Sequence, residues 1–137
     1  MILLDTNVFI WMAAGDSSLG HAARDAIERA REEDGLRVAA ITLWEISMLN
    51  RKNKVRLEGD VLAWVETTLT RSGIRLEALH PSIAVNAERL PGNLQRDPAD
   101  RMIVATARHL ACPLLTSDRE ILAYAAQGHV SAINARR

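Results

Sequence analysis

The sequence has few cysteines, which form the disulfides of small secreted domains, and few aromatic residues, which stack on nucleic-acid bases. It has a single cysteine, Cys112, so no internal disulfide can form, which favours a reducing compartment. Aromatic residues make up only 4% of the chain, which argues against single-strand binding by base stacking. Lysine plus arginine and aspartate plus glutamate are equal at 17 each, so only a local patch can attract a polyanion.

Long hydrophobic runs are also missing. Asp5 interrupts the apolar N-terminal run well before the ~7–15 residues of a secretory signal core are complete. No uncharged stretch approaches the ~20 residues of a membrane-spanning helix, so we expect a cytoplasmic protein without a membrane partner. With 48% hydrophobic and 25% charged residues, the composition is that of a globular protein, and the length fits one domain over residues 1–137.

Short apolar segments alternate with amphipathic ones along the whole chain. The expected strands are residues 1–4, 36–41, 74–79, 113–116 and 129–133. The expected helices are residues 8–14, 21–34, 43–49, 61–72, 81–90, 98–110 and 118–126. This alternation predicts an α/β fold with a central parallel sheet of four to five strands, right-handed crossovers and helices on both faces.

Acidic residues follow several of these strands or begin the helices. Asp5 and Asp118 both follow apolar strands, and Glu45 is expected in the first turn of the helix after the second strand. Asp97 and Asp100 open a helix of their own. Because ligands of an open parallel sheet bind at the carboxyl ends of its strands, these carboxylates are expected to converge at one edge. Clustered carboxylates without histidine or thiolate favour Mg²⁺ or Mn²⁺.

A metal site of this kind favours hydrolysis of a phosphodiester, and no P-loop, dinucleotide fingerprint or serine elbow competes with it. Each acid also has a purely structural interpretation. Asp5 and Asp97 can cap helices, while residues 42–45 and 117–120 both match the capping-box pattern. Independent caps have no reason to lie at one edge of one sheet, so the metal site is the favoured interpretation.

The basic residues likewise allow two interpretations. A dense run can contact RNA phosphates or simply be solvated, and it comprises Arg51, Lys52, Lys54 and Arg56. Arg101, which is adjacent to Asp100 in sequence, is the better candidate for contacting a phosphate or an acid at the predicted site.

Four segments together resemble a known family. They are Leu3-Leu4-Asp5-Thr6-Asn7-Val8, Thr42-Leu43-Trp44-Glu45-Ile46, Asp97-Pro98-Ala99-Asp100-Arg101-Met102-Ile103 and Leu115-Thr116-Ser117-Asp118. In this order, and at this chain length, they look like the PIN-domain ribonucleases, specifically the VapC-type toxins of bacterial type II toxin–antitoxin pairs. The resemblance covers almost the whole chain.

This resemblance implies a metal-binding and catalytic set consisting of Asp5, Glu45, Asp100 and Asp118. It implies polar support from Thr6, Asn7 and Ser117, with Asp97 as an accessory acid or cap. It further implies a Mg²⁺- or Mn²⁺-dependent endoribonuclease that cuts structured RNA, such as transfer or ribosomal RNA, and leaves a 5′-phosphate and a 3′-hydroxyl. A homodimer and an inhibitory VapB-type antitoxin are implied as partners.

Two other interpretations stay open. A PIN-like module that binds RNA or protein without cutting would not need its acids for binding. An aspartyl-phosphate enzyme would use Asp5 as the phosphoacceptor. Enzymes that resemble the haloacid dehalogenases would carry a second aspartate two residues later, where this chain has Asn7.

Overall fold

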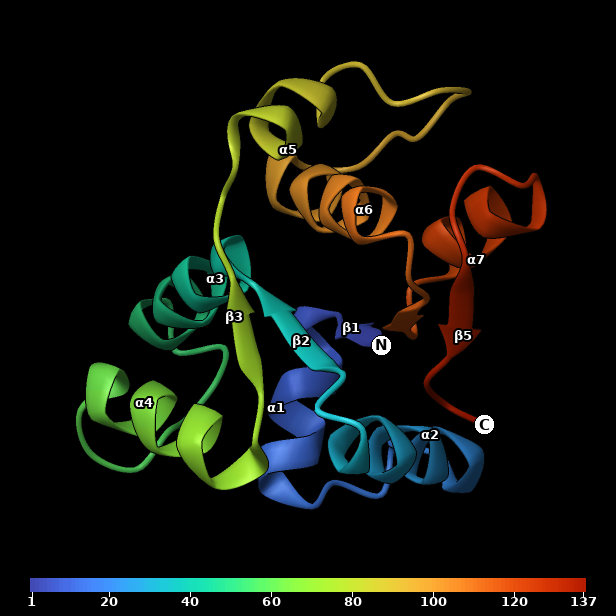
Figure 1. Cartoon of the computed structure of the whole chain (residues 1–137). Helices are drawn as coiled ribbons and strands as arrows, with labels where there is room; N and C mark the ends of the chain where they lie inside the picture. Colours follow the sequence, from blue (N-terminus) through green and yellow to red (C-terminus); the bar gives the residue numbers. More distant parts are fainter.

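The computed structural model describes all 137 residues and contains a five-stranded sheet flanked by seven helices (Figure 1). The strands are β1 (Ile2–Leu4), β2 (Leu36–Ala39), β3 (Arg75–Glu77), β4 (Leu114–Thr116) and β5 (Ala132–Asn134). The helices are α1 (Thr6–Ala14), α2 (His21–Glu32), α3 (Ala40–Arg51), α4 (Val61–Ser72), α5 (Pro81–Asn86), α6 (Pro98–Leu110) and α7 (Arg119–Ala126). None of them combines the length and hydropathy needed to cross a bilayer.

The strand order is β3-β2-β1-β4-β5, and every neighbouring pair is parallel. The chain builds the sheet from β1 outward through β2 and β3, then crosses to the other side of β1 for β4 and β5. The direction of building therefore reverses between β1 and β4, where Leu4 lies opposite Leu115. In open α/β sheets, ligands bind in the crevice at the carboxyl end of such a switch point.

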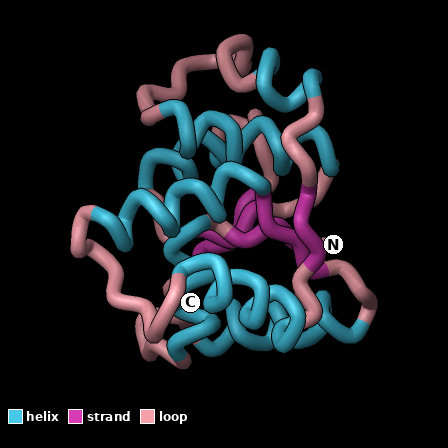
Figure 2. The backbone as a smooth tube through the Cα atoms, turned by 90° about the vertical axis from the view of Figure 1, so that its left-hand side faces the viewer, coloured by secondary structure: helices cyan, strands magenta, loops and turns pink.

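Alternate side chains of β1 point to opposite faces of the sheet and enter two parts of the core. Ile2 and Leu4 pack with residues of α1, α2 and α4, whereas Leu3 packs with residues of α6 and α7. Figure 1 shows these two groups of helices on opposite sides of the sheet, and the view in Figure 2 shows the strands between them. The predicted α/β fold with helices on both faces is confirmed, and β1 is a rigid base for the residue that follows it.

Several element boundaries differ from those expected. The second strand ends at Ala39 instead of residue 41, because the backbone turns into α3 at Ala40. α5 ends at Asn86, short of residue 90, and the last strand spans Ala132–Asn134 instead of residues 129–133. Short apolar runs do not distinguish the end of a strand from the first turn of a buried helix, so their ends are poorly defined by sequence.

Candidate active site

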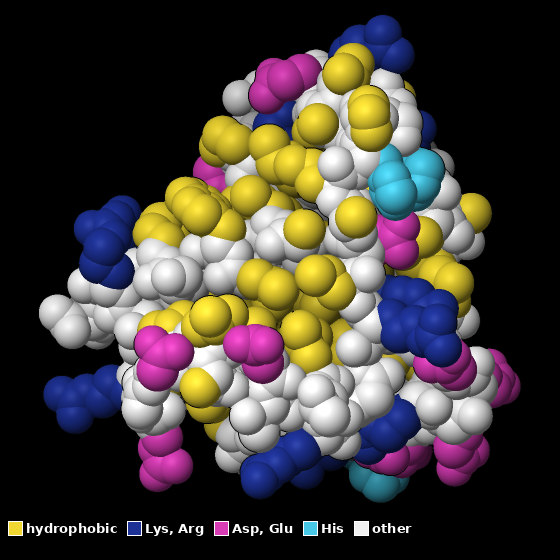
Figure 3. Space-filling model, turned by 60° about the vertical axis from the view of Figure 1, so that its left-hand side comes forward, with side chains coloured by type: hydrophobic (Ala, Val, Ile, Leu, Met, Phe, Trp, Pro, Cys, Tyr) yellow, Lys and Arg dark blue, Asp and Glu magenta, His cyan; other side chains and the backbone are white.

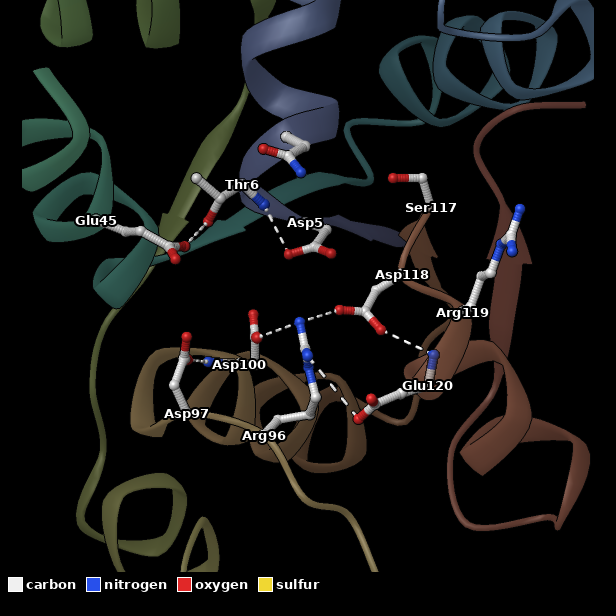
Figure 4. Close-up of a pocket in the computed structure, with 11 residues that line it drawn as sticks. Asp5, Thr6, Glu45, Arg96, Asp97, Asp100, Ser117, Asp118, Arg119 and Glu120 are labelled. Carbon is white, nitrogen blue, oxygen red and sulfur yellow. Dashed lines mark hydrogen bonds and ion pairs between the residues drawn. The ribbon is translucent and has the colours of Figure 1, made fainter. Parts of the chain in front are cut away.

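A polar pocket of about 470 Å³ lies at the carboxyl edge of the sheet, beside the junction of β1 and β4. No hydrophobic residue lines it. Its lining residues are Asp5, Thr6, Asn7, Glu45, Arg96, Asp97, Asp100, Ser117, Asp118, Arg119 and Glu120. Six of these are acids and two are arginines, and Figure 4 shows carboxylates from several elements turned toward a common space. The structure therefore brings together all four acids of the expected catalytic set.

Asp5 is fixed by hydrogen bonds from two distant parts of the chain. Its Oδ1 accepts the backbone N–H of Thr6 at 2.8 Å, which makes it the N-cap of α1. Its Oδ2 accepts the hydroxyl of Thr116, at the end of β4, at 2.6 Å. Asp5 is only 7% exposed, and this burial raises its pKa despite both bonds. Capping of α1 uses only Oδ1, whereas the bond from Thr116 to Oδ2 ties the same carboxylate to the end of β4.

Glu45 reaches the same pocket from the second turn of α3. The hydroxyl of Thr6 donates to its Oε1 and lies 3.1 Å from the hydroxyl of Thr42. Because the N-cap of α3 is Ala39, the capping-box interpretation of residues 42–45 is wrong, and so is the expected first-turn position of Glu45. Burial, followed by the charges of Asp5 and Asp97, raises the pKa of Glu45.

Asp97 and Asp100 occupy the start of α6. Asp97 is the N-cap, and its Oδ1 accepts the backbone N–H of Asp100 at 2.9 Å, with Pro98 in the first turn. Burial, followed by the charges of Asp5 and Asp97, raises the pKa of Asp100 from 3.8 to about 7. One carboxylate oxygen each of Glu45, Asp97 and Asp100 lies within 4.8 Å of the other two. A shared cation would relieve this crowding of negative charge.

Asp118 joins the pocket from the start of α7. Its Oδ1 accepts the backbone N–H groups of Glu120 at 2.9 Å and Ile121 at 3.1 Å, so Asp118 and not Ser117 caps this helix. Its own N–H donates to the hydroxyl of Thr116 at 3.0 Å. Thr116 therefore links two pocket acids, a role that the sequence reasoning missed. The sequence shows only a polar residue at the end of an apolar strand, and its complete burial is seen only in the structure.

Arg96 supplies the positive charge at the centre of the pocket. Its guanidinium forms an ion pair with Asp118, lies 3.1 Å from Asp100 and lies 3.8 Å from Glu120. Burial opposes the charge of Arg96, but these carboxylates outweigh burial and raise its pKa. With Arg119, the pocket has two arginines against six acids, so acidic side chains outnumber basic ones.

The expectation that Arg101 lies at the site is wrong. Its Nε donates to the carbonyl of Ala87 at 2.9 Å, and a terminal nitrogen donates to the carbonyl of Leu94 at 2.7 Å. Consecutive residues of a helix are separated by about 100° around its axis, so Asp100 and Arg101 face different directions. Arg96 was missed because it lies in the loop before the helix, where adjacency in sequence to Asp100 gives no guidance.

The basic run lies outside the pocket. Arg51 is the last residue of α3, and the exposed or half-exposed turns that follow it include none of the pocket residues. The run consists of Arg51, Lys52, Lys54 and Arg56. A contact between this run and RNA stays a prediction.

The chemistry of the pocket fits a hard divalent cation. Its candidate ligands are carboxylate oxygens, and no histidine or cysteine lines it. The raised pKa values of Asp5, Glu45 and Asp100 show that burial and crowding make their charged forms costly in the absence of such an ion. The residues present are therefore suited to hold Mg²⁺ or Mn²⁺.

Comparison with known proteins agrees with this geometry. The model of the PIN domain family matches residues 2–127. Ribonuclease VapC22 of Mycobacterium tuberculosis is 38% identical over 120 residues, which cover 88% of each chain. A chain of DNA-bound VapBC from Salmonella typhimurium aligns over 97% of this chain and 96% of its own, with a TM-score of 0.71 and 18% identity.

A second solved structure shares the fold. VapBC2 from Rickettsia felis, bound to a DNA fragment from its promoter, aligns over 98% of both chains with a TM-score of 0.70 and 14% identity. Identities this low show a common fold and nothing finer. The family match and the 38% identical relative carry more weight. Together they show that this chain belongs to the PIN-domain family, as a relative of the VapC ribonucleases.

Proposed function

We propose that this protein is a VapC-type toxin, a metal-dependent endoribonuclease that hydrolyses a phosphodiester in structured RNA of the transfer or ribosomal class. The observation that carries this proposal is the convergence of Asp5, Glu45, Asp100 and Asp118, from four separate segments, on one pocket. The name of the relative Ribonuclease VapC22 supports RNA as the substrate. The solved VapBC complexes support inhibition by a VapB-type antitoxin.

The same four acids are the proposed ligands of Mg²⁺ or Mn²⁺. Such an ion, when bound, polarises a phosphodiester and lowers the pKa of a water molecule. The contribution of the chain is to hold its carboxylates in place before substrate arrives. Thr116 orients Asp5, and Thr6 orients Glu45, each through a hydroxyl that donates to the carboxylate. Asn7 and Ser117 line the pocket as further polar groups.

Arg96 replaces Arg101 as the proposed phosphate contact. A guanidinium can form paired hydrogen bonds with phosphate oxygens, and that of Arg96 already lies among the pocket acids. The buried Nε of Arg96 has no hydrogen-bond partner. No hydrogen bond at Nε therefore has to break when the side chain changes rotamer to reach an RNA phosphate. Arg96 is therefore positioned to neutralise acids in the free protein and phosphate in the complex.

An exposed apolar face supports the proposed protein partners. Large hydrophobic side chains are exposed on α3, α4, β3, the turn after β3 and the end of α5, namely Trp44, Leu62, Leu76, Leu79 and Val85. Figure 3 shows hydrophobic side chains gathered over this side of the molecule. Contiguous apolar surface of this kind marks protein–protein contacts. It agrees with a toxin that assembles as a homodimer and binds an antitoxin.

The proposed nuclease activity is tested with Asp5→Asn. We expect purified protein to cleave structured RNA in the presence of Mg²⁺ or Mn²⁺, and the variant to lose about a hundredfold or more of the rate, because it loses a ligand carboxylate. The amide oxygen of Asn can still accept the N–H of Thr6, so α1 keeps its cap and the domain stays folded. Cleavage is measured by gel electrophoresis, and folding by circular dichroism.

Asp25→Asn is the matched control, because Asp25 lies exposed on α2 and does not line the pocket. We expect this control to cleave at the wild-type rate, and chelation of divalent ions to stop both proteins. Equal cleavage by wild type and Asp5→Asn would contradict the assigned site. RNA binding without cleavage by either protein would favour the non-cutting module instead.

A further inference from the structure

Three side chains outside the acidic pocket form a second cluster with metal-ligand chemistry. Glu77 ends β3, His80 is the N-cap of α5, and His109 lies in the last turn of α6. One ligand atom of each residue lies within 4.8 Å of those of the other two. We infer that Glu77, His80 and His109 form a site for a borderline divalent transition metal such as Zn²⁺.

The distances match those around one tetrahedral ion. Zn–N bonds of about 2.0–2.1 Å place neighbouring ligand atoms about 3.3 Å apart and the centroids of two bound imidazole rings about 5 Å apart. In the structure, Nε2 of His80 lies 3.1 Å from Oε1 of Glu77. The ring centroids of His80 and His109 are 5.4 Å apart, with 31° between the ring planes. Both values are close to those expected around one bound ion.

A neighbouring hydroxyl prepares His109 for such an ion. Oγ of Ser82 lies 3.3 Å from Nδ1 of His109. When the hydroxyl accepts the Nδ1–H, the lone pair of Nε2 is free to bind the metal. A hydrogen bond on the far nitrogen of this kind orients metal-binding histidines and fixes their tautomer. Ser82 and His80 both belong to the start of α5, so the support and one ligand come from the same turn.

The ligand set separates this cluster from the acidic pocket. Two imidazole nitrogens and one carboxylate are a common zinc donor set, whereas carboxylates alone suit Mg²⁺. Three protein ligands leave one tetrahedral position for water, and both histidines are exposed. Figure 3 shows histidine side chains beside an acidic one at the margin of the exposed apolar face. The exposed pair of His21 and Asp25, 3.5 Å apart on α2, belongs to no such three-residue group.

An ion bound to this cluster would stabilise the fold, because its ligands come from different secondary-structure elements. It would tie the edge strand β3 and the start of α5 to the C-terminal end of α6. Glu77 and His80 are close in sequence, but His109 is distant from both, and the unfolded chain would not hold the three ligands together. An ion that binds the folded chain preferentially stabilises it by mass action.

The test uses full-length protein without a histidine tag, in a large excess of Mg²⁺ to occupy the acidic pocket. We expect calorimetric titration with Zn²⁺ to show one strong site per chain. His80→Ala and His109→Ala should each weaken binding by about tenfold or more, and Ser82→Ala by less. Co²⁺ should give the intense visible absorption of tetrahedral coordination, which an octahedral all-oxygen site does not show.

His21→Ala is the control and should bind Zn²⁺ like wild type. Asp5→Asn should also keep the zinc site, so the outcome does not depend on the proposed nuclease activity. The Co²⁺ spectrum of the unmodified protein tests the coordination without any substitution. Absence of strong Zn²⁺ binding, or binding that survives both histidine substitutions, would overturn the assignment.

Discussion

Arg96 pairs with Asp100 and Asp118, so it would compete with the proposed divalent cation for these two carboxylates. Substitution Arg96→Gln removes the competing charge, so we expect Mn²⁺ to bind about tenfold more tightly, as a Coulomb interaction at this range allows. The same substitution removes the cation that pairs with the buried Asp100 and the half-buried Asp118, so the metal-free variant should unfold at a lower temperature. Isothermal calorimetry and thermal unfolding measure the two effects.

Arg119 provides the matched control, because it lines the same pocket but forms no ion pair. Arg119→Gln should change Mn²⁺ affinity and metal-free stability less than Arg96→Gln does. If the two variants behave alike, Arg96 is a general contributor to the charge of the pocket and not a specific counter-ion of its acids.

At the scale of secondary-structure elements, three helices begin with an acid that faces the pocket. Asp5, Asp97 and Asp118 are the N-caps of α1, α6 and α7. Each carboxylate satisfies free backbone N–H groups and benefits from the positive end of the helix dipole. Capping therefore does not exclude the proposed metal binding at these positions, because the carboxylates that cap the helices also line the pocket.

Asp97 allows its capping role to be separated from its charge. Asp97→Ala should lower the free energy of unfolding by about 1 kcal/mol, because the N–H of Asp100 loses its acceptor. Asp97→Asn keeps an acceptor oxygen and should cost less. Urea denaturation measures both values.

Asp60→Ala is the control, since Asp60 caps α4 through the N–H of Ala63 and lies outside the pocket. It should cost a similar free energy of unfolding without changing RNA cleavage. If Asp97→Ala costs nothing while Asp60→Ala is destabilising, the bond from Asp97 to Asp100 does not stabilise α6.

Some residues of the pocket could be predicted from the sequence and others could not, depending on where each lies in the fold. Asp5 and Asp118 follow buried strands, so their convergence at the sheet edge could be predicted from topology alone. Arg96 and Thr116 could not, because one lies in a loop and the other looks like an ordinary strand residue. Their roles depend on side-chain directions and on hydrogen bonds between segments that are distant in sequence.

For the whole molecule, the raised pKa values of the pocket acids make the free energy of unfolding depend on pH and on bound metal. An acid with a raised folded pKa contributes stability that is fully present below its unfolded pKa and is lost as the pH rises through the folded value. For Asp100 this loss falls between pH 3.8 and about 7. Bound Mn²⁺ favours the charged form, so we expect Mn²⁺ to raise the unfolding temperature more at about pH 8 than at about pH 5.

Thermal unfolding with and without Mn²⁺ at both pH values tests this linkage. Asp100→Asn removes an acid whose pKa is raised to about 7, so it should reduce the difference between the two pH values. A stabilisation by Mn²⁺ that is the same at both pH values in the wild type would show that Asp100 does not titrate against the metal.

The bond between Thr116 and Asp5 joins residues 111 positions apart. β1 is made first during synthesis, yet its neighbour β4 and the acid after it come from the last part of the sequence. A growing chain that has not reached Asp118 therefore lacks one wall of the pocket. A ribosome making this protein carries an incomplete nuclease until translation is nearly finished, and prematurely terminated chains lack the assembled centre.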